Sequence, residues 1–337
     1  MTALRWGIVG TGLIADMMAK DLREGTGERE HVVAAVGSRT AASAERFGDA
    51  HDVPAGHRHG SYAELVADDT VDVVYVATPH PMHLADAVLA LDAGKPVLVE
   101  KAFTMTGAEA RELVAHAGRA GLFCMEAMWT RFLPHVVRIR EILAGGALGR
   151  IELVTADHGQ WFESDPGFRL FAPELGGSAL LDLGVYPVSF ASMVWGGAQP
   201  ERLVTMIDPA FNGLVDGQTS MIFGYPGGGQ SLLTCTSAAR SATRASIVGT
   251  EGRIDVEGDF YAPTTFTVTP RGGEPTTEDL PFRGRGMAYQ ADEVARCLEA
   301  GRTESDVLPL TETVAIMQTM DAVLADGGMP VGAQTSG

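Results

Sequence analysis

The first 125 residues alternate short apolar runs with segments whose apolar residues recur at helical spacing. This pattern predicts strands at Leu4–Val9, Val32–Val36, Val71–Ala77, Pro96–Val99 and Leu122–Met125, and helices at Leu13–Arg23, Ala41–Phe47, His83–Ala93 and Gly107–Ala120. Strands that alternate with helices form βαβ units, because a parallel neighbour can be reached only by a crossover connection. The pattern therefore predicts an N-terminal α/β domain, a doubly wound parallel sheet of the Rossmann type.

The second part of the chain has a different pattern, with many strands and few helices. After a predicted helix at Pro134–Leu143, strands are predicted at Ile151–Asp157, Leu203–Ile207, Thr219–Phe223, Gln230–Thr236, Ala245–Val248, Arg253–Val256 and Thr265–Val268, and helices at Ala288–Ala300 and Thr311–Ala325. Short turns such as Tyr225–Gly229 favour antiparallel pairing. We expect residues 1–125 to form the Rossmann domain, residues 126–330 an α+β domain on a mostly antiparallel open sheet, and residues 331–337 a tail.

Composition excludes several classes of partner. The 337 residues carry 25 basic and 43 acidic side chains, a net charge of −18, which repels nucleic acid and anionic lipid surfaces. We see no apolar run of membrane-spanning length and no secretory signal at the N-terminus. The three cysteines, Cys124, Cys235 and Cys297, show no metal-binding or disulfide spacing. These features predict a soluble, cytoplasmic protein with no nucleic-acid or membrane partner.

The turn after the first predicted strand has the sequence Gly10-Thr11-Gly12-Leu13-Ile14-Ala15. Gly10 permits a tight turn, Gly12 leaves room for a pyrophosphate to approach the backbone, and Ala15 lets the helix pack closely on the strand. The free N–H groups and positive dipole end at the start of the helix suit an anion. The turn therefore predicts a dinucleotide site, although Gly-x-Gly-x-x-Ala also occurs in plain structural βα turns.

The second predicted strand ends in Gly37-Ser38-Arg39. An NAD-specific domain usually carries an acidic residue at this point, where it holds the ribose 2′-hydroxyl. A serine hydroxyl and a guanidinium instead suit a 2′-phosphate, so Ser38 and Arg39 predict a preference for NADP, with NAD as the alternative. Otherwise Arg39 is an ordinary solvated residue near a helix start.

The segment Thr78-Pro79-His80-Pro81-Met82-His83 follows the third predicted strand. Its prolines keep it extended, so it could line the nicotinamide side of the cofactor or could simply be a rigid loop. The pairs His80/His83 and His57/His59 are conceivable metal ligands. Neither pair has an evident third ligand in the sequence, so no metal site is predicted.

Two further groups carry chemistry. Glu100-Lys101 follows the next predicted strand, where an ammonium could stabilise an alkoxide formed during hydride transfer; the alternative is a surface Glu–Lys pair. Asp182 and Tyr186 are four residues apart and would share one face of a helix, unless the segment is only a capped helix with a buried tyrosine. Tyr186 could move the reacting proton, an adjacent Lys101 would lower its pKa, and Asp182 could orient the substrate.

Taken together, these motifs resemble those of the Gfo/Idh/MocA oxidoreductases, in the same order and over nearly the whole chain. Within that family the sequence is most similar to the dimeric trans-dihydrodiol dehydrogenases, also described as NADP-dependent D-xylose 1-dehydrogenases. The similarity includes the run from Glu126 to Pro134 (EAMWTRFLP) and the run from Leu180 to Pro187 (LLDLGVYP).

The resemblance implies that Lys101 and Tyr186 are catalytic, that Asp182 and Trp129 lie near the substrate, and that Arg169 lies near the nicotinamide. It also implies that the open face of the second sheet forms a homodimer or homotetramer. Two positions are distinctive: Ala102 stands where the family has proline, and Tyr186 where many members have histidine. The tyrosine argues against inositol-dehydrogenase-like chemistry.

The predicted activity is reversible hydride transfer between NADP and a hydroxyl or carbonyl carbon of a sugar, a dihydrodiol or a related polyol. Two alternatives stay open at this point. One is a non-redox enzyme that retains its nicotinamide and works by transient oxidation, which tightly bound cofactor would favour. The other is a non-catalytic NADP-binding sensor, which would have no need of Lys101, Asp182 and Tyr186.

Overall fold

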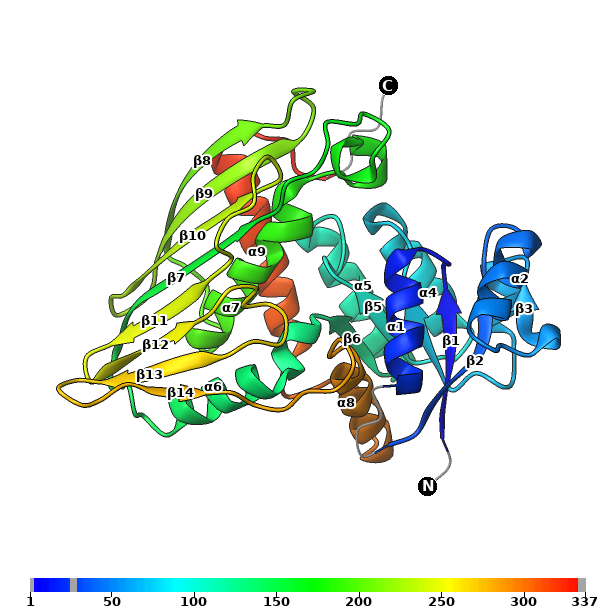
Figure 1. The fold of residues 1–337 in the computed structure, drawn as a ribbon. Coiled ribbons are helices and arrows are strands. Elements are labelled where there is room, and N and C mark those ends of the chain that lie inside the picture. Colours follow the sequence, from blue (N-terminus) through cyan, green and yellow to red (C-terminus); the bar gives the residue numbers. More distant parts are fainter. Residues whose placement is uncertain (1–2, 25–28, 333–337) are drawn as a thin grey trace. The chain divides into compact units, whose positions relative to one another are not determined.

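The computed structural model describes residues 3–24 and 29–332, so residues 333–337 of the predicted tail lie outside the described part. The chain forms two compact units, each assembled from separate stretches of sequence (Figure 1). Unit 1 comprises Met1–Thr104, Ala108–Phe132 and Phe282–Thr313. Unit 2 comprises Met105–Gly107, Leu133–Pro281 and Val314–Gly337.

Unit 1 contains the predicted Rossmann sheet. Its strands are β1 (Leu4–Val9), β2 (His31–Gly37), β3 (Arg58–His59), β4 (Val73–Val76), β5 (Val97–Glu100) and β6 (Cys124–Ala127). All pairs are parallel, and the spatial order is β3-β2-β1-β4-β5-β6. The direction of progression reverses between β1 and β4, which is where doubly wound sheets bind their ligands. The prediction of a doubly wound parallel sheet is confirmed.

Helices of unit 1 connect these strands, as the periodicity predicts. They are α1 (Leu13–Glu24), α2 (Ala41–Ala50), α3 (Tyr62–Val66), α4 (His83–Asp92) and α5 (Gly107–Ala120). Apolar side chains at the centre of the sheet are fully buried, among them Trp6, Ile8, Tyr75 and Leu98. Such continuous burial is what a sheet covered on both faces requires.

Part of the sequence predicted to belong to the second domain packs with unit 1. Helix α8 (Ala288–Glu299) contacts α1. The Asp21 carboxylate on α1 accepts hydrogen bonds from the backbone N–H groups of Arg285, at 2.9 Å, and Met287, at 2.7 Å, just before α8 begins. These bonds fix the returning chain on α1 and explain why residues 282–313 cluster with the N-terminal sheet. The division of the chain into domains at residue 125 stays a prediction.

Unit 2 is built on an eight-stranded sheet in the order β14-β13-β12-β11-β7-β10-β9-β8. The strands are β7 (Ile151–Gly159), β8 (Arg202–Pro209), β9 (Asp216–Gly224), β10 (Gln230–Thr236), β11 (Ala245–Gly249), β12 (Gly252–Val256), β13 (Phe266–Pro270) and β14 (Thr276–Glu278). Every pair is antiparallel except β7 with β10, which confirms a mostly antiparallel sheet. The helices of this unit are α6 (Pro134–Ala144), α7 (Val185–Val194) and α9 (Leu310–Asp326).

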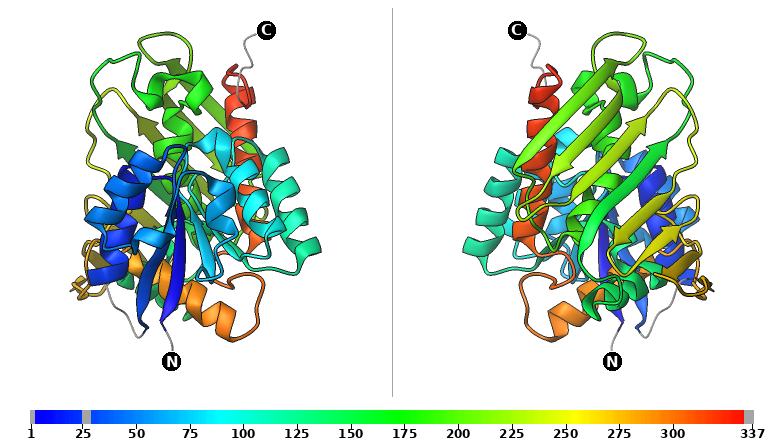
Figure 2. Two further views of the ribbon diagram at one scale, coloured as in Figure 1. Left: turned by 90° about the vertical axis from the view of Figure 1, so that its right-hand side faces the viewer. Right: turned by 90° about the vertical axis from the view of Figure 1, so that its left-hand side faces the viewer.

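One face of the unit 2 sheet is covered and the other is open. Helix α7 packs on β7 and β10. The right-hand view of Figure 2 shows the opposite face of the sheet, with none of the described helices in front of it. Alternation along β9 agrees with this arrangement, because Met221 and Phe223 are buried whereas Ile222 between them is half exposed.

We expected no apolar run of membrane-spanning length. This expectation is wrong when the chain is judged by length and composition alone. The stretch Pro173–Val194 has 22 residues, and its best window has a mean hydropathy of 1.3. In the structure 83% of that window is buried inside the protein. A core helix of a globular protein meets the same criterion, because it too is apolar on all sides.

Candidate active site

The predicted cofactor turn connects β1 to α1 in the way the sequence suggests. Gly10 adopts a φ of +103°, and a Cβ at this position would stand 2.8 Å from the Ala77 carbonyl oxygen at the end of β4. A Cβ on Gly12 would meet nothing within 4 Å, so the backbone there is open to a ligand. Ala15 is fully buried against the sheet. The residues present therefore fit a dinucleotide pyrophosphate at the start of α1.

Ser38 and Arg39 lie beside this turn, at the end of β2. The Gly10 N–H donates to the Gly37 carbonyl at 3.0 Å, and the Thr11 and Ser38 hydroxyl oxygens are 3.4 Å apart. Ser38 is buried and Arg39 is exposed. The structure thus brings the Ser38 hydroxyl next to the glycine turn, and the exposed Arg39 follows it in the chain.

The segment after β4 holds the backbone that follows β5. β4 and β5 are neighbouring parallel strands of the unit 1 sheet. The His80 ring nitrogen Nε2 lies 3.2 Å from the Lys101 carbonyl oxygen, and His83 Nδ1 lies 3.0 Å from that of Ala102. The other His83 nitrogen, Nε2, faces the Thr78 carbonyl at 2.8 Å. His80 and His83 therefore position the Lys101–Ala102 segment, whose peptide bond is cis.

Glu100 also holds the backbone at Lys101. Its carboxylate accepts hydrogen bonds from the Lys101 N–H, at 3.1 Å, and from the Tyr75 hydroxyl, and its side chain is buried. A surface Glu–Lys pair, the alternative interpretation, does not fit this burial. A second acid, Glu126, lies at the end of β6 and accepts the Phe103 N–H at 3.2 Å. Burial raises the pKa of Glu126 to about 7.

Trp129, the residue implied near the substrate, lies in a 3₁₀ turn at Trp129–Phe132 that follows β6. It is 5% exposed. Within the same turn the Arg131 guanidinium donates to Glu312 at 2.6 Å. The position after a strand end matches where ligands of such sheets bind, and the contact of Trp129 with substrate stays a prediction.

Unit 2 brings Asp182 and Arg169 together. The Arg169 guanidinium donates to both carboxylate oxygens of Asp182, at 3.0 and 3.2 Å. Asp182 lies in a π-helical turn, Leu180–Gly184, and Tyr186 in the α-helix that follows it, so the expected single α-helix begins with a wider turn. Gly184 is required here, because a Cβ would stand 2.9 Å from the Cys235 sulfur on β10.

Tyr186 belongs to a cluster of three rings that the sequence did not reveal. Its ring centroid is 5.2 Å from that of His158 on β7 and 4.9 Å from that of Tyr261. His158 Nδ1 faces the Leu183 carbonyl at 3.1 Å, so that nitrogen carries the proton and Nε2 accepts from the Gln160 amide at 2.9 Å. These contacts fix the ring next to Tyr186. No motif in the sequence connects residues so far apart.

The structure separates the predicted catalytic residues between the two units. Lys101 belongs to unit 1, whereas Asp182 and Tyr186 belong to unit 2. The pairing of Lys101 with Tyr186, and with it a lowered pKa for the tyrosine, stays a prediction.

The two histidine pairs have different surroundings. The ring nitrogens of His80 and His83 face backbone carbonyls and hold the backbone around Lys101. His57 and His59 instead both contact the Asp68 carboxylate, at 2.7 and 2.8 Å. Asp68 is the third potential ligand that the sequence did not indicate, because it lies on the far side of α3.

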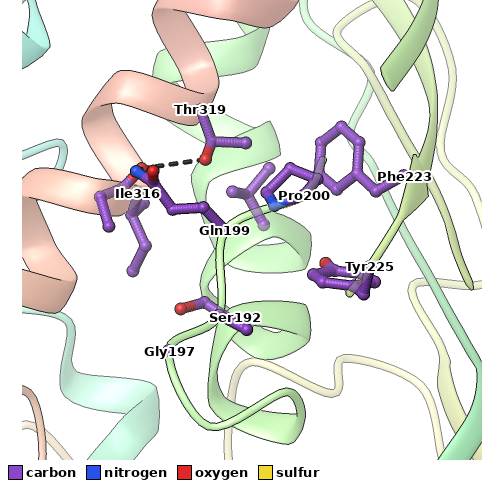
Figure 3. A pocket seen from close by; sticks show the side chains of 11 residues that line it. Ser192, Gly197, Gln199, Pro200, Phe223, Tyr225, Ile316 and Thr319 are labelled. Carbon is purple, nitrogen blue, oxygen red and sulfur yellow. Dashed lines mark hydrogen bonds between the residues drawn. The ribbon is translucent and has the colours of Figure 1, made fainter. Parts of the chain in front are cut away.

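Another hollow in unit 2 has no chemistry of this kind. Figure 3 shows its lining, which includes Ser192, Gln199, Phe223, Tyr225 and Thr319. The Thr319 hydroxyl donates to the Ala315 carbonyl at 2.9 Å, and burial raises the pKa of Tyr225 to about 12. None of the predicted site residues lines this pocket, so it is not a candidate active site.

The environment of His83 predicts a pH dependence of stability. Burial lowers the pKa of its imidazole to about 4, and the Lys101 ammonium adds to the effect. Because the ordinary pKa is about 6.5, the unfolded chain takes up this proton first, so stability is complete above pH 6.5 and falls towards pH 4. A shift of this size corresponds to about 3 kcal/mol.

We expect His83→Gln to have a flatter profile of unfolding free energy between pH 7 and about 4.5 than the wild type, because the amide donates a hydrogen bond but does not titrate. Urea unfolding at each pH measures this, with His116→Gln on the surface of α5 as the control. A His83→Gln slope equal to the wild-type slope contradicts a buried neutral His83.

Comparisons with known proteins agree with the geometry of both units. Residues 4–128 match a model described as an oxidoreductase family with an NAD-binding Rossmann fold, and residues 136–255 match the GFO/IDH/MocA C-terminal domain. The trans-1,2-dihydrobenzene-1,2-diol dehydrogenase of Bos taurus is 39% identical over 327 residues, which cover 95% of this chain and 96% of the relative. D-xylose 1-dehydrogenase (NADP(+)) of Hypocrea jecorina is 38% identical over 362 residues, covering 97% and 92%.

A solved structure shows the same fold at lower identity. The aldose-aldose oxidoreductase from Caulobacter crescentus superposes with a TM-score of 0.87 at 24% identity, covering 97% of this chain and 98% of the other. The family is decided by the two family models and by the relatives that are 38–39% identical over 95% or more of the chain. The chain belongs to the GFO/IDH/MocA family of oxidoreductases.

Proposed function

We propose that this protein is an NADP-dependent dehydrogenase or reductase that acts on a hydroxyl or carbonyl carbon of a sugar, a dihydrodiol or a related polyol. The observation that carries the proposal is the glycine turn, open at Gly12, at the point where the strand order of a Rossmann sheet reverses. The printed activities of the two relatives, a diol dehydrogenase and an NADP-dependent xylose dehydrogenase, support this substrate class.

NADP, when bound, supplies or accepts the hydride. The chain's own residues then have separable tasks. The backbone at Gly10–Gly12 and the start of α1 would hold the pyrophosphate, and Ser38 and Arg39 the 2′-phosphate. Thr78, Pro79 and His80 would border the nicotinamide side, whereas the predicted cofactor contact His83 is fully buried and would hold the surrounding backbone instead. Glu100 contributes indirectly, because its carboxylate holds the Lys101 amide.

We assign the proton movement to Tyr186, with Lys101 stabilising the oxygen from which the proton leaves. Two observations support the assignment. The Lys101 backbone is fixed by Glu100 and His80, so its ammonium starts from a rigid position. Tyr186 is fixed by the rings of His158 and Tyr261. Asp182, oriented by Arg169, would hold a substrate hydroxyl.

We expect Lys101→Met to lower kcat by about 100-fold or more, because it removes the ammonium that assists proton transfer. NADPH affinity, measured by fluorescence titration, should change little. Lys20→Met, which removes an exposed lysine on α1, is the matched control. Tyr186→Phe should lower kcat similarly, and normal turnover in either catalytic variant contradicts the assignment.

We expect Arg39→Ala to weaken NADPH binding by about tenfold or more, the size of one lost charge-assisted hydrogen bond. NADH binding should be unaffected, because that cofactor has no 2′-phosphate. Titration of both cofactors measures the ratio, with Arg46→Ala on exposed α2 as the control. Unchanged NADPH affinity without a shift towards NADH would remove Arg39 from the site.

We further propose that the open face of the unit 2 sheet pairs two copies of the chain in a homodimer, or in a tetramer built from such pairs. Val204 on β8, Ile222 on β9 and Leu232 on β10 are register partners and form an apolar row across three strands. They are 64%, 48% and 42% exposed, and Met206 on β8 is 72% exposed. Adjacent exposed apolar side chains on one sheet face favour association.

We expect Ile222→Lys combined with Met206→Lys to convert the wild-type oligomer to monomer, because each buries a charge in the interface. Sedimentation velocity at micromolar protein measures the mass, and retained NADPH binding shows that the variant is folded. Val331→Lys, at another exposed apolar position, should leave the mass unchanged. A monomeric wild type overturns the proposal.

We also propose a reducing, cytoplasmic-type location. All three cysteines are buried free thiols, which supports it. Burial raises the pKa of Cys297 to about 12, so the thiol stays protonated.

A further inference from the structure

We propose that His57, His59 and Asp68 form a binding site for a divalent transition metal ion such as Zn²⁺, at the outer edge of the unit 1 sheet. One ligand atom from each residue lies within 4.8 Å of the others. Two imidazole nitrogens and one carboxylate oxygen are the donor set of many zinc sites, with solvent in the fourth position.

The three residues come from consecutive elements of the chain. His57 ends a 3₁₀ turn at Ala55–His57, and His59 ends the two-residue strand β3. Helix α3 follows, and Asp68 lies in the turn after it. The short helix returns the chain so that Asp68 faces the two histidines, and a bound ion would close this loop.

The Asp68 carboxylate is oriented so that one of its oxygens faces the two histidines and could bind a metal ion. Its Oδ1 accepts from the Thr70 amide at 2.8 Å and from the Thr70 hydroxyl at 2.6 Å. Its Oδ2 faces His57 Nδ1 at 2.7 Å and His59 Nε2 at 2.8 Å. In metal sites, the side chains that bind the ion are typically held in orientation by hydrogen bonds from neighbouring residues. Thr70 therefore acts as a positioning residue for a monodentate carboxylate.

Access also suits a cation. The Asp68 side chain is 6% exposed, whereas His57 is 32% exposed and gives solvent a way in. The Lys95 ammonium, a cation close to the site, is held by the Asp68 and Val71 main-chain carbonyls, to which it donates at 3.1 and 2.7 Å.

Metal binding requires a small rearrangement. Ligand atoms around a tetrahedral zinc ion stand roughly 3.3 Å apart, so each ring nitrogen must retreat from Asp68 by roughly 0.5 Å. Each ring must also carry its proton on the nitrogen that faces away from the ion. Both changes are local, because His57 lies in a partly exposed turn.

The position of the site gives it a consequence for the cofactor, which rests on the proposed NADP function. Strand β3 pairs with the end of β2, with Gly37 opposite His59. The His59 carbonyl accepts the Ser38 N–H at 3.1 Å. An ion that holds His59 also holds the residue placed at the 2′-phosphate. By linkage, the metal should change NADPH affinity and NADPH should change metal affinity by the same factor.

Titration of metal-free protein with ZnCl₂ alone, followed by isothermal calorimetry, tests the site without any cofactor. We expect one ion per chain, and affinity at least about tenfold lower in His57→Gln, His59→Gln and Asp68→Asn. Asp69→Asn, one residue along and exposed, and His116→Asn should bind as the wild type does. Co²⁺ bound in place of zinc should show the visible absorption bands of an ion with low coordination number. The two control variants should show the same bands.

Several results would overturn the proposal. They are no binding, more than one equivalent ion per chain, and binding that survives all three substitutions. Asp68→Asn alters a buried side chain and could fail to fold. His57→Gln alters the most exposed ligand, so this variant still tests the site if its circular dichroism spectrum is that of the folded wild type. Zinc binding with unchanged NADPH affinity leaves the metal site intact and overturns its coupling to the cofactor turn. Loss of NADPH binding in every protein would instead contradict the proposed function.

Discussion

The close approach of β1 and β4 at Gly10 is the constraint on which unit 1 depends. The chain leaves β1 with a positive φ and passes so near the Ala77 carbonyl that no side chain would fit. The next turn, at Gly12, is open, and the Asp16 N–H bonds to the Gly12 carbonyl at the start of α1. One tight contact therefore fixes the strand pairing and directs the free N–H groups of a helix towards the edge of the sheet.

The other strand ends of unit 1 are connected by side chains rather than by sequence proximity. Thr78 donates to Asp86, and the same Thr78 carbonyl faces His83. His83 in turn reaches across to the backbone after β5, and Glu100 supports the Lys101 amide from below. Buried polar groups of this kind must find partners, so they tie neighbouring loops into one rigid layer. A rigid layer is what the placement of a catalytic ammonium needs.

Local pattern predicted most helices and strands because burial imposes a period on each of them. β1, β10 and α5 begin and end at the residues that the sequence indicated. The elements missed are short or exposed, such as β3, α3 and β14, where few apolar residues mark a period. His158 and Tyr261 were missed because their ring partners are distant in the chain, and Asp68 because the short helix α3, which turns it back towards His57 and His59, was itself not predicted.

The sequence by itself determined the Rossmann sheet, the glycine turn, the serine and arginine that follow β2, and the identity of the lysine and tyrosine. These are local properties: a periodicity, a residue without a side chain, a charge at a strand end. Only the tertiary structure decided that residues 282–313 pack with unit 1, that two histidines hold the backbone around Lys101, and that Asp68 meets His57 and His59. Such contacts depend on how the chain turns back and packs on itself, which the periodicity of single elements does not encode.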